Sequence, residues 1–89
     1  MTASVLEAIR QDRLALSVGG ALALANETAA SEGIDPVASL VTITQETTPE
    51  GRCWSVHYGP VDFIHQRGGD LTILVDEAGE TVRQVLRGQ

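Results

Sequence analysis

The chain has 89 residues, of which 43% are hydrophobic and 20% are charged, a composition typical of a globular protein rather than a disordered one. Twelve acidic residues face six basic ones, all arginine, which gives a net charge of −6. Because nucleic acids and anionic membranes are bound by clustered cations, we expect neither as a partner of this acidic protein. Arginine without lysine, together with abundant alanine and glycine, is typical of a GC-rich bacterial genome.

Size and cysteine content limit the domain organisation and the compartment. A chain of this length buries roughly 60–65% of its unfolded surface, enough for one core but not for a deep substrate cavity. Cys53 is the only cysteine, so no internal disulfide can form. The N-terminus lacks a secretory signal pattern, and the most apolar stretch, residues 14–25, is too short to span a bilayer. We therefore predict a single domain over residues 1–89, located in the cytoplasm.

The N-terminal third shows the apolar spacing of helices. Ser4 and Glu7 fit a capping box, in which the serine side chain accepts a free backbone N–H and the glutamate reaches back. The apolar face that follows is short and consists of Val5, Leu6 and Ile9. A face of about two turns is too short to be helical alone in water, so we expect something else to bury it.

A second helical pattern follows, with apolar residues at Val18, Leu22, Ala25 and Ala29. Ser17 is a candidate N-cap for this helix, and Gly33 suits the left-handed residue that often ends one. Asp35-Pro36 confirms the end, because the residue before proline avoids the α region. Gly19-Gly20 costs a helix interior about 2 kcal/mol relative to alanine. We therefore expect two helices broken near residues 14–20, with one long helix over residues 1–33 as the alternative.

After Pro36 the apolar spacing changes from the helical period to alternation, which is typical of strands. The four expected strands cover residues 40–45, 52–58, 71–75 and 81–86. Connections between them are short or turn-like, which favours an antiparallel meander. On the second strand we expect Trp54, Val56 and Tyr58 on one face, with Cys53, Ser55 and His57 on the other. Helices followed by strands predict an α+β fold, with the helical segment on one face of the sheet and Trp54 in the core.

Three segments carry a resemblance to known folds: Trp54-Ser55-Val56, Gly68-Gly69, and the Asp-x-x-Gly-Glu-x-Val turn within residues 75–82. With the alanine-rich helix before them, they make residues 17–87 resemble PepSY-type and other cystatin-like small domains. The same residues are similar to bacterial immunity-type proteins of the nuclear-transport-factor-like fold. The resemblance implies a cystatin-like fold and a non-catalytic role, and it transfers no site residues. Residues 1–16 have no counterpart in it and are expected to form an N-terminal helical extension.

Residues that could carry chemistry form no convincing site. Cys53 and His57 lie on one strand face about 13 Å apart at 3.3 Å per residue, whereas a catalytic pair needs contact near 3 Å. His57, Asp62 and His65 are a ligand set that metals use, but nothing else in the loop would hold them together.

Two further motifs also do not predict a phosphate-binding or calcium-binding site. Gly68-Gly69-Asp70 lacks the lysine and the following helix of a phosphate loop. Asp76, Glu77 and Glu80 lack the spacing of a calcium-binding loop, so Asp76 is expected to serve the turn. We therefore assign no catalytic, cofactor-binding or metal-ligating residue, and we expect that the protein is not an enzyme.

The expected function is a small non-catalytic binding or regulatory module, immunity-like or inhibitor-like, that acts through protein–protein contact. A homodimer is expected, because an open sheet edge and a swapped N-terminal helix both lead to two-fold association. One alternative is a small-ligand-binding protein or a lyase- or isomerase-like enzyme of a cystatin-like fold. The residues that would converge in its concavity are His57, Tyr58, Asp62 and His65. The other alternative is a homo-oligomeric assembly subunit, in which residues 1–16 swap onto a neighbour.

Overall fold

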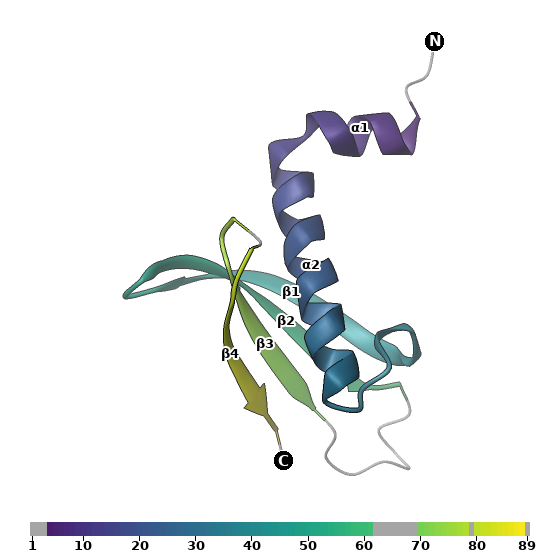
Figure 1. The fold of residues 1–89 in the computed structure, drawn as a ribbon, viewed down its shortest axis with the longest axis vertical. Helices are drawn as coiled ribbons and strands as arrows, with labels where there is room; N and C mark the ends of the chain where they lie inside the picture. The colour runs from purple at the N-terminus through teal and green to yellow at the C-terminus, as the bar shows by residue number, and fades with distance from the viewer. Residues whose placement is uncertain (1–3, 62–69, 79, 89) are drawn as a thin grey trace.

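The structure is a computed structural model that describes residues 4–61, 70–78 and 80–88. It begins with two α-helices, α1 (Val5–Gln11) and α2 (Arg13–Ser31), and a short 3₁₀ helix, η1 (Pro36–Ala38). The strands are β1 (Ser39–Thr48), β2 (Gly51–Pro60), β3 (Leu71–Asp76) and β4 (Val82–Arg87). They form one antiparallel sheet in the order β1-β2-β3-β4 (Figure 1). The predicted α+β fold with a four-stranded meander is confirmed.

α2 covers one face of the sheet and packs on its two central strands, β2 and β3 (Figure 1). Its sheet-facing side is a stripe of small side chains, and the fully buried members are Ala21, Ala25 and Ala29. The larger core side chains come from the strands and are Trp54, Val56, Tyr58, Leu71, Ile73 and Val75. The core therefore forms between one helix and two strands, and the predicted place of Trp54 in it is confirmed, with 7% of that residue exposed.

The two helices meet at Asp12, so the predicted break near Gly19-Gly20 is wrong in its position. Asp12 has an extended backbone (φ −109°, ψ 110°), and its N–H donates to the carbonyl of Ile9, which ends α1. Its carboxylate accepts the N–H of Ala15 at 3.0 Å, which begins α2. Ser17, the predicted N-cap, lies inside α2 instead.

Both glycines of the pair lie within α2, because the packing of that helix outweighs their local cost. Each glycine costs about 1 kcal/mol relative to alanine, whereas most helical stability in proteins comes from tertiary packing. Here the buried alanine stripe on the sheet supplies that packing. The predicted end of the helix is correct: Gly33 has φ 87°, and its N–H donates to the carbonyl of Ala30 at 3.0 Å.

α1 projects from the rest of the molecule and has no buried residue (Figure 1). The radius of gyration is 14.3 Å, compared with about 12 Å for a compact chain of this length. The expected boundary between residues 16 and 17 falls inside α2. Neither described α-helix has the length and apolarity that crossing a bilayer requires.

Candidate interaction surfaces

His57 and Tyr58, two of the residues considered for a catalytic concavity, lie on opposite faces of β2. Tyr58 belongs to the core beneath α2, whereas His57 pairs with Asp70, Nε2 to Oδ2 at 3.3 Å. Asp62 and His65 lie outside the described residues. The described part of the chain therefore does not bring His57 and Tyr58 into one concavity.

Tyr58 connects β2 to α2. Its hydroxyl donates to Oδ1 of Asn26 at 2.6 Å, and the side chain is fully buried. Burial disfavours the charged phenolate and raises the pKa of Tyr58 from 10.0 to about 12. The phenol therefore keeps its proton at neutral pH. Its hydroxyl serves as a hydrogen-bond donor that links the sheet to α2.

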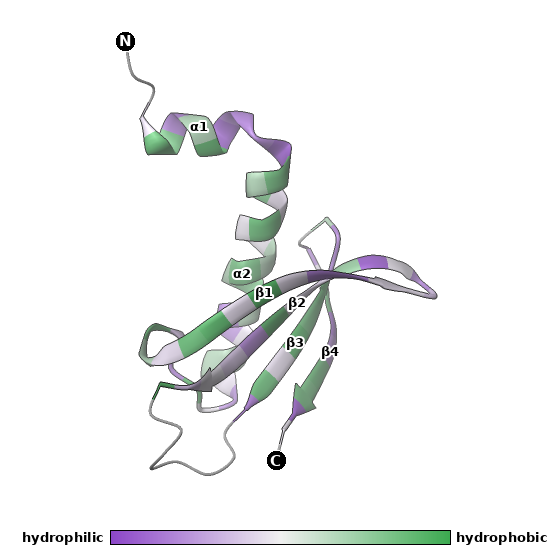
Figure 2. Cartoon of the chain, turned by 180° about the vertical axis from the view of Figure 1, so that it is seen from behind, coloured by the Kyte–Doolittle hydropathy of each residue, from purple (hydrophilic) through white to green (hydrophobic). Residues whose placement is uncertain are grey.

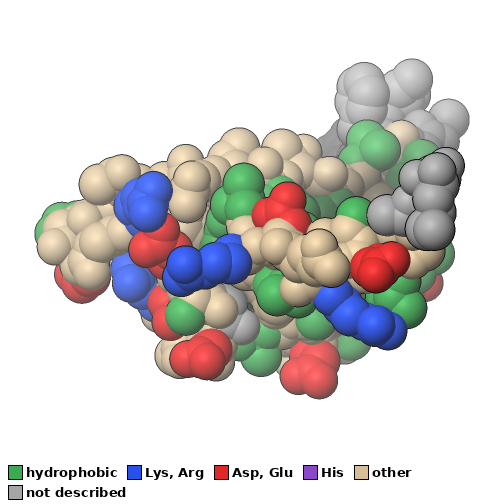
Figure 3. Space-filling model, turned by 90° about the horizontal axis from the view of Figure 1, so that it is seen from above, with side chains coloured by type: hydrophobic (Ala, Val, Ile, Leu, Met, Phe, Trp, Pro, Cys, Tyr) green, Lys and Arg blue, Asp and Glu red, His purple; other side chains and the backbone are tan. Residues whose placement is uncertain are grey.

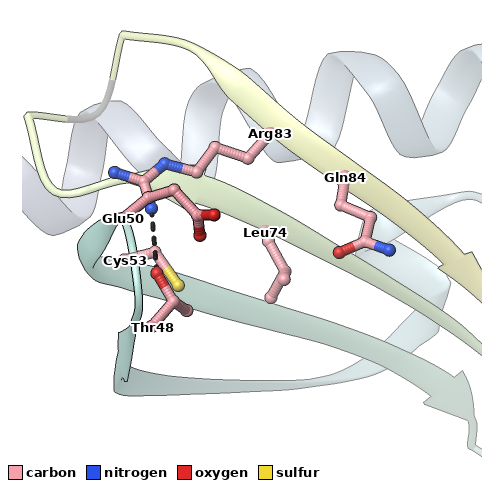
Figure 4. Close-up of a pocket in the computed structure, with 6 residues that line it drawn as sticks. All are labelled: Thr48, Glu50, Cys53, Leu74, Arg83 and Gln84. Carbon is pink, nitrogen blue, oxygen red and sulfur yellow. Dashed lines mark hydrogen bonds between the residues drawn. The ribbon is translucent and has the colours of Figure 1, made fainter.

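Cys53 lies at a hollow on the face of the sheet that α2 leaves uncovered (Figure 4). The hollow has a volume of about 490 Å³, and its lining residues are Thr48, Glu50, Cys53, Leu74, Arg83 and Gln84. Arg83 reaches from β4 across the hollow and donates to Oγ1 of Thr48 at 3.3 Å. No histidine is among these lining residues, and Cys53 is fully buried.

Two acidic residues at the turn between β3 and β4, Asp76 and Glu77, have structural partners. Oδ1 of Asp76 accepts the backbone N–H of Glu80 at 2.8 Å and of Thr81 at 2.9 Å, so its predicted role in the turn is confirmed. Glu77 forms an ion pair with Arg52. In the described segments, no three His, Cys, Asp or Glu side chains are grouped to hold a metal ion. Gly68-Gly69 lies outside those segments.

A second hollow, of about 500 Å³, lies between the start of α2, the β1–β2 hairpin and the β3–β4 turn. Trp54 lines it, and its indole N–H donates to Oγ of Ser17 at 2.9 Å and to the carbonyl of Glu77 at 3.3 Å. Ser17 in turn donates to that same carbonyl. Sequence reasoning missed this role of Ser17, although its position four residues before Ala21 places it near the buried helix stripe.

Exposed aliphatic side chains lie on α2, η1 and β4 and at Val61. Five more lie on α1 and β1, two elements that have no buried residue. On α1 they are Val5, Leu6 and Ile9, with 78%, 58% and 41% of each residue exposed. On β1, Leu40 is 56% and Val41 is 39% exposed, and no residue of this ten-residue strand is buried. Figure 2 shows apolar segments along β1. Figure 3 shows a face on which arginines and acidic residues are interspersed, with apolar side chains between them.

No protein-family model, curated protein or solved structure matches the chain. The observed α+β fold is compatible with the cystatin-like description, and the resemblance to PepSY-type and immunity-type domains stays a prediction. The surfaces of α1 and β1 are therefore the features of this chain that bear on its function.

Proposed function

We propose that this protein is a small non-catalytic binding module that acts through protein–protein contact, with α1 as its contact element. The observation that carries the proposal is the exposure of Val5, Leu6 and Ile9 on a helix that leaves the body of the molecule. A helix of seven residues is marginal in water by itself. Burial of one such aliphatic side chain contributes about 1.5–3 kcal/mol. A partner with an apolar groove would therefore stabilise α1 and cover this face.

The placement of His57 and Tyr58 supports binding rather than catalysis. Tyr58 is buried and bonded to Asn26, while His57 pairs with Asp70 on the other face of the sheet. Neither arrangement leaves a positioned acid–base pair in a concavity, which is what catalysis of this kind requires. Cys53 is a free thiol, a state that a reducing compartment preserves, so we propose a cytoplasmic location for this module.

The test is site-specific photo-crosslinking in the native host. A benzophenone side chain replaces Leu6 on α1, and a matched variant carries the same group at Ala23, an exposed position of α2. We expect a discrete protein adduct from position 6 and none from position 23. Equal adducts from both positions, or no adduct from position 6, would overturn the proposal.

A second variant separates contact from folding. Val5→Ser and Ile9→Ser, combined with the crosslinker at position 6, remove apolar surface that contributes nothing to the core. The adduct should disappear while the melting temperature of the protein stays the same. An adduct that survives both substitutions contradicts a role for this face.

The alternative function as a homo-oligomeric assembly subunit has separate support, which is the open edge of β1.

A further inference from the structure

The edge formed by β4 is protected against pairing with another strand. β4 has six residues and two exposed arginines, Arg83 and Arg87, and its register with β3 shifts between Leu74 and Val75. Arg87 is also held to the end of α2: Nη2 donates to Oε1 of Glu32 at 2.7 Å and to its carbonyl at 2.9 Å. Short length, charge and a break in register are features that prevent edge-to-edge association.

The opposite edge, formed by β1, has none of this protection over most of its length. β1 has ten residues in continuous register with β2, and residues 39–45 include no charged residue and no proline. Aliphatic side chains lie on both of its faces: Leu40 and Val41 are exposed, and Ile43 is half-buried. An edge strand presents unpaired backbone N–H and C=O groups, so this edge is a template for another strand.

We propose that β1 pairs with β1 of a second copy of this chain, antiparallel about a two-fold axis at Thr42, to form one continuous eight-stranded sheet. This inference goes beyond the proposed function, because it names a second contact surface, the edge of β1, and a second copy of the chain as its partner. Two-fold association requires a surface that is complementary to itself, and the side chains of β1 meet that requirement.

The register follows from which side chains lie opposite each other. With the axis at Thr42, Val41 lies opposite Ile43 of the second copy, on the face that carries α2. On the other face, Leu40 lies opposite Thr44 of the second copy. Directly opposed aliphatic pairs stabilise antiparallel strands by roughly 0.2–1 kcal/mol each.

Neighbouring registers of the two β1 strands place less favourable side chains opposite each other. An axis at Ile43 would place Leu40 opposite the charged Glu46, and an axis at Val41 would separate the Val41–Ile43 pair. With the axis at Thr42, Glu46 lies opposite Ala38, and no two like charges are directly opposed.

The experiment uses the full chain and reads its mass by sedimentation equilibrium and native mass spectrometry at micromolar concentration. The wild type should show twice the chain mass of 9.4 kDa. Thr42→Lys and Thr42→Glu each place two like charges directly opposite across the axis, and each should weaken the dimer at least tenfold. Thr42 is exposed, so neither variant should change the fold. An equal mixture of the two should recover a dimer that contains one copy of each.

The matched control is Gln84→Lys, which adds the same charge at an exposed position on the protected edge. This variant should dimerise like the wild type. A monomeric wild type, or variants at Thr42 that dimerise unchanged, would overturn the inference. Dimerisation lost only when Val5, Leu6 and Ile9 are changed to serine would assign the contact to α1 instead and would also overturn it. A monomeric wild type whose α1 still forms its crosslink would leave the proposed function standing.

Discussion

The inner part of the molecule (α2, β2 and β3) and the outer part (α1 and β1) use similar side chains in opposite ways. Leu71, Ile73 and Val75 of the inner part are fully buried, whereas Leu6 and Leu40 of the outer part are more than half exposed. The difference lies in what faces them: the alanine stripe of α2 covers the central strands, and no described element covers α1 or the edge of β1. The same residue types therefore stabilise the fold in one part and are available for contact in the other.

The largest effect should come from removing the biggest side chain of the inner part. Trp54→Ala removes an indole that packs in the core and donates to Ser17. Truncation of a buried tryptophan costs about 3–5 kcal/mol, which lowers the melting temperature of a domain this small by more than about 10 °C. Thermal unfolding followed by circular dichroism measures this. Trp54→Phe, which keeps most of the packing, is the control and should lose less. A Trp54→Ala variant that melts like the wild type would contradict this assignment of the core.

A matched pair of leucines tests the division most directly. Leu71→Ala should cost about 2–5 kcal/mol, because the side chain is fully buried in the core. Leu6→Ala should change the free energy of unfolding by less than about 0.5 kcal/mol, because 58% of that residue is exposed. Urea titration of dilute protein measures both. Equal losses for the two variants would show that α1 belongs to the folding core.

Tyr58 gives the inner part a pH dependence. Its pKa is about 12 in the folded protein against 10.0 for a free phenol, so the folded state binds the proton more tightly than the unfolded state. The stability from this proton is complete below pH 10 and is lost as pH rises toward 12. The chain has one tyrosine, so phenolate absorbance follows this group alone. In urea the midpoint should fall to about 10. The same midpoint with and without urea would contradict burial of the phenol.

A small effect should come from changing the glycine pair in α2. Gly19→Ala should raise the free energy of unfolding by about 1 kcal/mol, because the residue is helical and nothing lies within 4 Å of the added Cβ. Gly33→Ala is the contrasting control and should destabilise, because Gly33 has φ 87°. Chemical denaturation measures both changes. A loss of stability in Gly19→Ala would indicate that the helix does not run through this residue.

Local patterns predicted the class of each element well, and long-range contacts account for what they missed. The change of period after Pro36 and the turn residues were sufficient for the meander, and strand alternation placed Trp54 in the core. The break at Asp12 was missed because Ser17 is an equally good cap by residue type. In the folded protein Ser17 lies inside α2 and bonds instead with Trp54 and the carbonyl of Glu77, which are distant in sequence.

The surfaces were harder to predict than the fold. Alternation in residues 40–45 predicts a half-buried strand, but which strand lies at an edge, and whether a helix reaches it, depends on packing between distant segments. For the same reason, sequence alone did not show that Tyr58 and His57 would be bound by Asn26 and Asp70.

Asp12 determines where the N-terminal face points. The same residue ends α1 through its backbone N–H and begins α2 through its carboxylate, so one extended residue sets the corner between the two helices. Without that corner, residues 5–31 would form a single straight rod of roughly 40 Å at 1.5 Å per residue. The apolar side chains of α1 would then continue along the axis of α2 instead of turning away from it. Asp12 therefore sets the direction in which α1 and its apolar side chains leave the rest of the molecule.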